Sequence, residues 1–175
     1  MYNQGREGEN KQQSTVNNQQ STINGQRLTR NLAPGTRHPP MRLLTFLARS
    51  FAWQPHSQTL ADAPPAQPGA VTEAVVAFIH VERRDEAQRD SAFRQSLKHL
   101  KWLANKRSLA TIVLHTFTHL GGENADPDFA QTLLLDLAER LRATGYQVEL
   151  TPFGWFCSWQ MDVYGESLAK VYKEI

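Results

Sequence analysis

The sequence predicts an α/β domain with a mixed β-sheet and two main helices. Several short runs are almost continuously apolar and rich in β-branched residues, which is typical of buried strands. Two longer stretches place apolar residues at helical spacing, which is typical of amphipathic helices. The order strand, strand, helix, strand, helix, strand, strand favours helices packed on a sheet.

The first two strands lie on either side of a proline-rich loop. Residues Arg42–Trp53 form an apolar run that predicts the first strand. Pro64, Pro65 and Pro68 then interrupt regular structure. The run Glu73–Glu82 is nearly continuous in apolar residues, so it predicts a strand that is buried on both faces.

Two helices alternate with the third strand. Asp90–Lys106 carries apolar residues at helical spacing, and Ser108–Phe117 predicts a strand. Asp126 can cap a second helix, because its side chain can accept hydrogen bonds from free backbone N–H groups. Pro127 suits the first helical position, and Gly145 suits the left-handed residue that follows a helix end.

The last elements surround a turn and end in a short amphipathic segment. Residues 147–151 and 156–164 predict two strands on either side of Pro152-Phe153-Gly154. Ser167–Ile175 is expected to form a final short helix, with Ser167 as its cap.

The first 40 residues differ in composition from the rest of the chain. They contain 18 Asn, Gln, Ser or Thr residues and only seven apolar ones. Such a segment buries too little apolar surface to offset the entropy of ordering, so we expect a disordered polar tail. The tail has five basic and two acidic residues, whereas residues 41–175 have 14 basic and 15 acidic ones. We expect the native chain to start at Met41, downstream of this tail.

Composition excludes several classes of protein. A single Cys can form neither an internal disulfide nor a multi-thiolate metal site. No stretch approaches the roughly 18 apolar residues that span a bilayer, so no membrane is expected as a partner. The acid-free stretch between Glu9 and Asp62 is typical of a transit peptide, but Pro34, Pro39 and Pro40 interrupt any amphipathic helix there. A cytoplasmic location is expected.

One candidate site follows the third strand, where open α/β folds often bind ligands. A metal could use His115, His119, Glu123 and Asp126. Two His residues four apart share a face reliably on a helix, and here they extend from a strand into a loop. The alternative places His115 in the sheet and Gly121-Gly122 in a plain turn, and we expect no metal.

A second candidate site is the aromatic segment Thr151–Trp159. Its aromatic rings could stack on a nucleobase, or they could simply belong to the core. Cys157 could be a nucleophile if His119 lies close enough to act as its base, or it could be inert packing. Ser167 and Lys170 have a serine–lysine spacing of three, which is a weak signal.

Five short motifs together resemble the archaeal-type editing domain of threonyl-tRNA synthetase. Met41-Arg-Leu-Leu is similar to the opening strand of that domain, and Ala77–Glu82 is similar to its Ala-Phe-Ile-x-Val-Glu motif. Phe117–Leu120 resembles its Phe-Ala-His-Leu segment. Residues 152–156 and 165–169 resemble its Pro-Phe-Gly-aromatic-aromatic turn and its Gly-His-Pro-Leu-Ala segment.

The resemblance implies a D-aminoacyl-tRNA deacylase-like sandwich over residues 41–175. It also implies a pocket for the 3′ end of an aminoacyl-tRNA, and a chemistry that removes serine from tRNA meant for threonine. Binding alone discriminates poorly against a missing methyl group, which is why a second site is useful. The implied substrate-binding residues are Val81, Phe117, Thr118, Trp155 and Phe156, and the implied catalytic residues are His119, Cys157 and Lys170.

Two of these positions depart from the family pattern. Cys157 occupies the position of the family's Lys, and Lys170 occupies the position of its acid. A neutral thiol does not offer the positive charge that stabilises an ester oxyanion. Two functions therefore stay open: a freestanding editing hydrolase, or a non-catalytic binder of an aminoacyl-nucleotide or regulatory module of a synthetase.

The expected partners follow from the same resemblance. They are the 3′ end of aminoacyl-tRNA, a threonyl-tRNA synthetase and a second copy of the chain in a homodimer. No cofactor is expected, because ATP and zinc belong to the synthetase catalytic body. Basic residues on the first helix and just after it could contact RNA, or could form a solvated helix face; they are Arg94, Lys98, Lys101, Lys106 and Arg107.

Overall fold

The structure is a computed structural model that describes residues 41–175, so the predicted tail of residues 1–40 lies outside the described residues. These residues form a six-stranded sheet with the order β4-β3-β2-β1-β5, in which β6 also pairs with β1. The strands are β1 (Arg42–Gln58), β2 (Gly69–His80), β3 (Thr111–Thr116), β4 (Gln147–Leu150), β5 (Trp155–Val163) and β6 (Lys170–Glu174).

The sheet is mixed, as predicted. β2 pairs with β3 in parallel, and β3 pairs with β4 in parallel. β1 runs antiparallel to β2, β5 and β6. The parallel strands therefore end at the same edge of the sheet, which is the edge where the loops after β2 and β3 meet.

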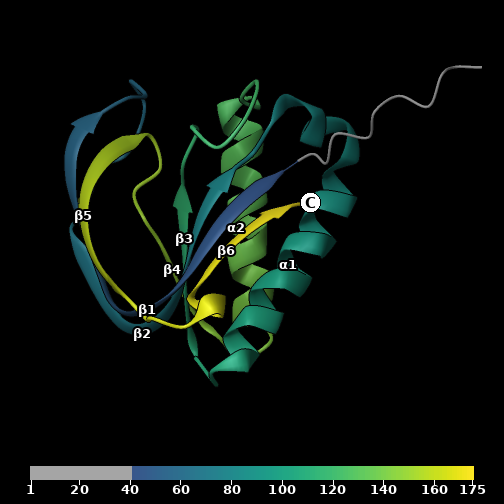
Figure 1. Cartoon of the computed structure of the whole chain (residues 1–175). Helices are drawn as coiled ribbons and strands as arrows, with labels where there is room; N and C mark the ends of the chain where they lie inside the picture. Colours follow the sequence, from purple (N-terminus) through teal and green to yellow (C-terminus); the bar gives the residue numbers. More distant parts are fainter. Residues whose placement is uncertain (1–40) are drawn as a thin grey trace, which may run out of the picture. The chain divides into compact units, whose positions relative to one another are not determined.

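Both helices, α1 (Arg89–Lys106) and α2 (Pro127–Arg142), lie on the same side of the sheet (Figure 1). The predicted start of α2 is confirmed, since Oδ1 of Asp126 accepts hydrogen bonds from the backbone N–H groups of Asp128 and Phe129. Gly145 follows the helix with a φ of 96°, a left-handed conformation that favours glycine. No helix of residues 41–175 is both long and apolar enough to cross a lipid bilayer.

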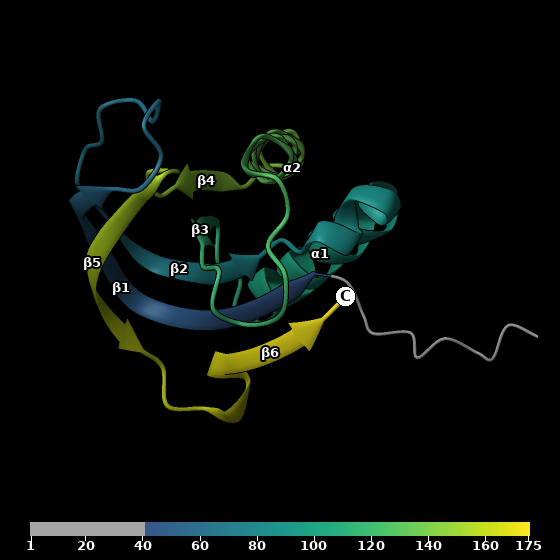
Figure 2. The same cartoon turned by 90° about the horizontal axis from the view of Figure 1, so that it is seen from above.

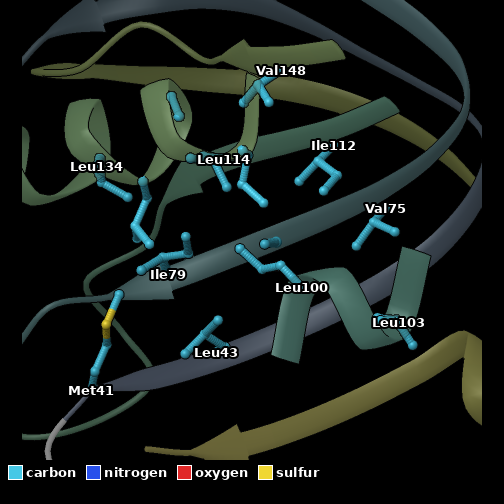
Figure 3. Packing of buried hydrophobic residues seen from close by; sticks show 14 of the residues in the cluster. Met41, Leu43, Val75, Ile79, Leu100, Leu103, Ile112, Leu114, Leu134 and Val148 are labelled. Atoms are coloured by element: carbon cyan, nitrogen blue, oxygen red, sulfur yellow. The ribbon is translucent and has the colours of Figure 1, made fainter. Parts of the chain in front are cut away.

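The main core lies between the sheet and the two helices (Figure 3). Leu100 and Leu103 of α1 pack against Val75 of β2 and Ile112 of β3, and all four side chains are fully buried. Burying one such side chain contributes about 1.5–3 kcal/mol relative to leaving it exposed. This core holds the parallel strands in place behind the candidate site.

A second, aromatic cluster lies on the other side of the sheet. There β1 and β2 curve strongly, and β5, which pairs with β1, follows the same curve (Figure 2). Phe78 is central to it, with ring centroids 5.5 Å from Phe46, 6.3 Å from Phe51 and 5.4 Å from Trp159 in edge-on contacts. The curvature brings the start of β5 close to the end of β3.

The predicted helix over Ser167–Ile175 is wrong. Only residues 167–169 form a single 3₁₀ turn, whose cap is Glu166, and Lys170–Glu174 is strand β6. β6 pairs with the first residues of β1, and the hydroxyl of Thr45 donates to the carbonyl of Val171 over 2.9 Å. An otherwise open edge of β1 supplies these hydrogen bonds, and they outweigh the weak local helix preference of a short segment.

Candidate functional site

A cavity of about 330 Å³ lies where β2 and β3 end. Four stretches of the chain form its walls: the start of the β1–β2 loop, the end of β2, the segment from the end of β3 through the following loop to the first turn of α2, and the β4–β5 turn with the start of β5. Seven of the eight site residues implied by the resemblance line it; they are Val81, Phe117, Thr118, His119, Trp155, Phe156 and Cys157.

The β1–β2 loop holds the β4–β5 turn against the cavity. The carbonyl of Gly154 accepts hydrogen bonds from the N–H groups of Thr59 at 2.7 Å and Leu60 at 3.3 Å. The indole Nε1 of Trp155 donates to the carbonyl of Pro64 over 3.0 Å. Trp155 is therefore fixed by the proline-rich loop, and Thr59 and Leu60 become part of the cavity wall.

The aromatic residues of β5 do not all face the same way. Successive strand residues point to opposite faces, so Trp155, Cys157 and Trp159 share one face and Phe156 takes the other. Phe156 is 60% exposed and Trp159 is 46% exposed. Trp159 makes an edge-on contact with Phe78, and both Trp159 and Phe156 line the cavity.

His115 lies in β3, as the non-metal interpretation expected, and it also lines the cavity. Its Nδ1 lies 2.8 Å from the hydroxyl oxygen of Thr151. Its ring makes an edge-on contact with Phe78, with centroids 4.6 Å apart. Burial lowers the pKa of His115 to about 4, so the imidazole is neutral near pH 7.

Phe117, Thr118 and His119 follow β3 in the loop that leads to α2. Phe117 continues the strand pairing, because its N–H donates to the carbonyl of Ile79 over 2.9 Å. The rings of Phe117 and His119 meet edge-on at 5.6 Å. Thr118 and His119 are exposed to solvent, so both side chains are accessible to a ligand at the cavity mouth.

A buried carboxylate organises the rest of this loop. Glu82 is 1% exposed and pairs with Arg42 of β1 and Arg84. Its Oε1 also accepts a hydrogen bond from the N–H of Gly122 over 3.1 Å. A Cβ on Gly121 would lie 1.6 Å from Nη1 of Arg42, so the close approach of this loop needs a glycine.

Cys157 and Lys170, which depart from the family pattern, lie in different parts of the domain. Cys157 lines the cavity together with His119, and burial raises the pKa of its thiol, which disfavours the reactive thiolate. Lys170 is exposed at the first residue of β6, opposite Phe46 of β1, and is not among the residues that line the cavity. The catalytic role of Lys170 therefore stays a prediction, and the residue does not line the cavity.

The alternative metal set is not brought together. His115 contacts Thr151, Glu123 pairs with Arg83 at 2.7 Å, and Asp126 caps α2. Within residues 41–175, no group of three or more His, Cys, Asp or Glu side chains could hold a metal ion.

The basic residues of α1 lie outside the cavity lining. Lys106 lies over the ring of Trp102, with Nζ 5.6 Å from the centroid. Arg107, just after the helix, stacks on Tyr164 at 3.7 Å and pairs with Glu166. Part of the predicted RNA-contacting set therefore has structural partners.

Several cavity residues were missed at the sequence level. Thr59 and Leu60 belong to a loop that no chemical motif marked, and Asn124 and Ala130 flank the predicted start of α2. Glu82 was visible as the last residue of a motif, but its role as the partner of Arg42 needs the pairing of β1 with β2. No local signal identifies these residues, because their neighbours are distant in sequence.

Residues 41–175 match the family model described as the archaea-specific editing domain of threonyl-tRNA synthetase. The chain belongs to this family. The match covers all the residues that form the sheet, the helices and the cavity, so the resemblance predicted from the five motifs is confirmed.

Curated relatives of the editing domain are archaeal threonine–tRNA ligases. The ligase of Thermococcus kodakarensis is 28% identical over 139 residues, which is 77% of this chain and 22% of the relative. That of Methanosphaerula palustris is 28% identical over 137 residues, with the same coverage. That of Pyrococcus furiosus is 31% identical over 107 residues, which is 61% of this chain and 17% of the relative. The chain thus spans about a fifth of the length of these ligases.

A solved structure shares the fold of the editing domain. The c-Myc DNA unwinding element binding protein aligns with a TM-score of 0.52 and 12% identity over 77% of this chain and 98% of its own. At this identity the likeness concerns the fold alone. The predicted D-aminoacyl-tRNA deacylase-like fold, with a mixed sheet and two helices, is confirmed.

Proposed function

We propose that this editing domain hydrolyses the ester bond of mischarged aminoacyl-tRNA, with seryl-tRNA for threonine as the preferred substrate. The observation that carries the proposal is the family match together with a cavity lined by seven of the eight implied site residues. The proposed partner is the 3′ end of the tRNA, and a threonyl-tRNA synthetase would be the source of the mischarged product.

The chemistry of the cavity supports a terminal aminoacyl-adenosine as the ligand. Exposed aromatic rings at the mouth, Trp159 and Phe156, offer surfaces on which an adenine can stack, a contact worth about 1–3 kcal/mol per base. The cavity of about 330 Å³ has room for a small amino acid next to these rings, and its lining also includes the polar residues Thr118, His119 and Asn124.

In the proposed reaction, a water molecule attacks the ester carbonyl carbon. His119, accessible at the cavity mouth, accepts the proton of that water as its oxygen bonds to carbon. The tetrahedral intermediate then collapses, the bond to the ribose oxygen breaks, and that oxygen takes up the proton that His119 had accepted. The products are the free amino acid and the deacylated tRNA.

The fold limits what can stabilise the oxyanion. The backbone N–H groups of Asp128 and Phe129 at the start of α2 already donate hydrogen bonds to the side chain of Asp126, so they do not serve an oxyanion. The thiol of Cys157 is neutral, and Lys170 does not line the cavity. We therefore propose a reaction that depends on positioned water and on His119 rather than on a fixed positive charge.

The same observations favour a second candidate function. A cavity that no Lys or Arg of residues 41–175 lines could bind an aminoacyl-nucleotide without hydrolysing it, as a sensor or a regulatory module of a synthetase. The positions of Cys157 and Lys170 are the specific observations that favour this function.

Deacylation assays distinguish the two functions. We expect the full 175-residue chain to release serine from seryl-tRNA for threonine faster than buffer alone, and to leave threonyl-tRNA nearly intact. His119→Ala should lower the rate by about a hundredfold or more, the usual contribution of a general base. His56→Ala is the matched control, because His56 is exposed on β1 and does not line the cavity.

The rates on aminoacyl-tRNA decide whether the domain is a hydrolase. Rates at the level of buffer on every aminoacyl-tRNA tested would reject the hydrolase. Calorimetric binding of 3′-(L-seryl)amino-3′-deoxyadenosine, an amide that the domain cannot hydrolyse as an ester, would then support the binding module. An unchanged rate in His119→Ala would show that His119 is not the general base of the reaction.

A further inference from the structure

His115 presents one ring nitrogen to the cavity and uses the other inside the protein. It is 7% exposed, lines the cavity, and comes from the parallel strand β3 in the centre of the domain. Nδ1 lies 2.8 Å from Oγ1 of Thr151. Nε2 has no hydrogen-bond partner among the described residues, and it is not among the polar atoms sealed from solvent.

The hydroxyl of Thr151 decides which nitrogen of His115 carries the proton. Thr151 is 5% exposed. Within residues 41–175, the hydrogen-bond partner of its hydroxyl is Nδ1 of His115. If the hydroxyl accepted a proton from Nδ1, its own proton would be buried without an acceptor, which is unfavourable. The hydroxyl therefore donates to Nδ1, and the neutral ring carries its proton on Nε2.

Nε2–H is thus a neutral hydrogen-bond donor that faces the cavity. Edge-on packing against Phe78 at 4.6 Å and the contact with Thr151 hold the ring orientation. A donor fixed in this way offers little rotational freedom, so it can discriminate between ligands by the presence and position of an acceptor.

We infer that His115 is a ligand-reading residue: its Nε2–H donates a hydrogen bond to an acceptor of the bound aminoacyl-adenosine, and Thr151 fixes the tautomer that makes this possible. The inference rests on the proposed function for the identity of the ligand. Acceptors occur both on the aminoacyl group and on the nucleoside, and the experiment is designed to tell these two sources apart.

The variants must remove the donor without unfolding the domain. His115→Phe alone would leave the hydroxyl of Thr151 without an acceptor, whereas the double variant His115→Phe with Thr151→Val replaces both partners by apolar groups of similar shape. His99→Phe is the matched control, since His99 is a second buried histidine beside a threonine hydroxyl, 3.3 Å from Thr45, and it does not line the cavity.

Calorimetry with three probes tests the inference. The probes are 3′-(L-seryl)amino-3′-deoxyadenosine, its L-alanyl counterpart, and adenosine. We expect the double variant to bind the seryl probe about tenfold more weakly, which corresponds to the loss of one neutral hydrogen bond. His99→Phe should bind it as the wild type does.

The pattern across probes identifies the acceptor. A loss for the seryl probe alone assigns the bond to the side-chain hydroxyl. A loss for both aminoacyl probes, but not for adenosine, assigns it to the aminoacyl carbonyl, and a loss for all three assigns it to the nucleoside. Equal affinities in the wild type and the double variant overturn the inference but leave the proposed function intact. Absence of any binding to the wild type overturns both.

Nitrogen NMR of histidine-labelled protein checks the tautomer directly. We expect the ¹⁵N shift of the His115 Nε2 to be that of a protonated nitrogen, and to change when the seryl probe is added. A proton on Nδ1 instead would contradict the role given to Thr151 and would overturn the inference.

Discussion

The backbone N–H of Gly122 donates a hydrogen bond to the buried carboxylate of Glu82, with 3.1 Å between the nitrogen and Oε1. The same carboxylate pairs with Arg42 at the start of β1. One side chain at the end of β2 therefore ties the first strand to the loop that follows His119. The shape of the cavity wall depends on an ion pair that lies outside the cavity.

Glu82→Ala should destabilise the domain, because the largely buried guanidinium of Arg42 loses its buried partner and keeps only the carboxylate of Glu174, whose Oε1 lies 3.1 Å from Nε. Breaking a buried pair costs about 3–5 kcal/mol when the remaining charge has no other partner, so the contact with Glu174 should hold the loss near or below the lower end of this range. Arg42 is only 14% exposed, so solvent replaces little of the interaction. Urea denaturation measures the effect on the free energy of unfolding.

Glu123→Ala is the control for this prediction. Glu123 pairs with Arg83 on the surface, where the two side chains are 71% and 59% exposed, and exposed pairs contribute at most about 1 kcal/mol. Equal losses in Glu82→Ala and Glu123→Ala would contradict the organising role of Glu82.

Gly154→Ala should weaken both stability and ligand binding. Gly154 has a φ of 77°, and a Cβ there would lie 2.8 Å from Cβ of Ala63 and 3.1 Å from Cβ of Leu60. The substitution would push the β1–β2 loop away from the turn that it holds. Gly145→Ala carries the same kind of backbone strain, about 1–2 kcal/mol, with nothing within 4 Å of its Cβ.

The comparison of the two glycine variants isolates the steric effect. We expect Gly154→Ala to lose at least 1 kcal/mol more than Gly145→Ala, as steric overpacking typically costs about 1–3 kcal/mol. We also expect only Gly154→Ala to weaken calorimetric binding of the seryl probe. Identical stabilities would show that the loop moves aside at no cost.

Two buried groups give opposite pH dependences of stability. Burial raises the pKa of Asp85 to about 7, so between about pH 4 and 7 the folded state holds a proton that the unfolded state releases, and stability falls as pH rises. Burial lowers the pKa of His115 to about 4, so between about pH 4 and 6.5 the unfolded state holds the extra proton, and stability rises with pH.

We therefore expect the stability of the wild type to rise less steeply between pH 4.5 and 6.5 than that of Asp85→Asn, because Asp85 opposes the contribution of His115. Asp85→Asn removes the falling contribution, so its free energy of unfolding should rise with pH, by up to about 1.4 kcal/mol per pH unit from His115. His80 and His99 add to this rise, because burial lowers their pKa values too. Urea denaturation at pH 4.5, 5.5, 6.5 and 7.5 measures the slopes. A falling slope in Asp85→Asn would be the opposite of the expected sign.

Thr45→Val should loosen strand β6. The hydroxyl of Thr45 is buried, donates to the carbonyl of Val171 over 2.9 Å and lies 3.3 Å from Nε2 of His99. A valine removes both contacts, so the carbonyl of half-buried Val171 and Nε2 of buried His99 each lose a partner, a loss of about 1–3 kcal/mol. Hydrogen exchange should show faster exchange of the β6 amides. Thr45→Ser keeps the hydroxyl and should retain the slow exchange; fast exchange in both variants would place the cause elsewhere.

Local sequence determined the elements whose signals are local. The start of α2 was predictable because Asp126 and Pro127 satisfy or remove the free N–H groups within one turn. The buried strands β2 and β3 were predictable because β-branched apolar runs can satisfy both their side chains and their backbone only inside a sheet. The family motifs predicted the pocket and seven of the 19 residues that line it.

Tertiary structure alone decided the rest. Residues 170–174 became a strand because the edge of β1 offered hydrogen bonds that the local sequence does not reveal. The same pairing set Lys170 opposite Phe46 and outside the cavity lining. Glu82 contacts Arg42, 40 positions away in the chain, and His115 contacts Thr151, 36 positions away. Both contacts exist only because strand pairing brings these distant segments together. Periodicity and spacing describe neighbours along the chain, whereas a cavity is made by neighbours in space.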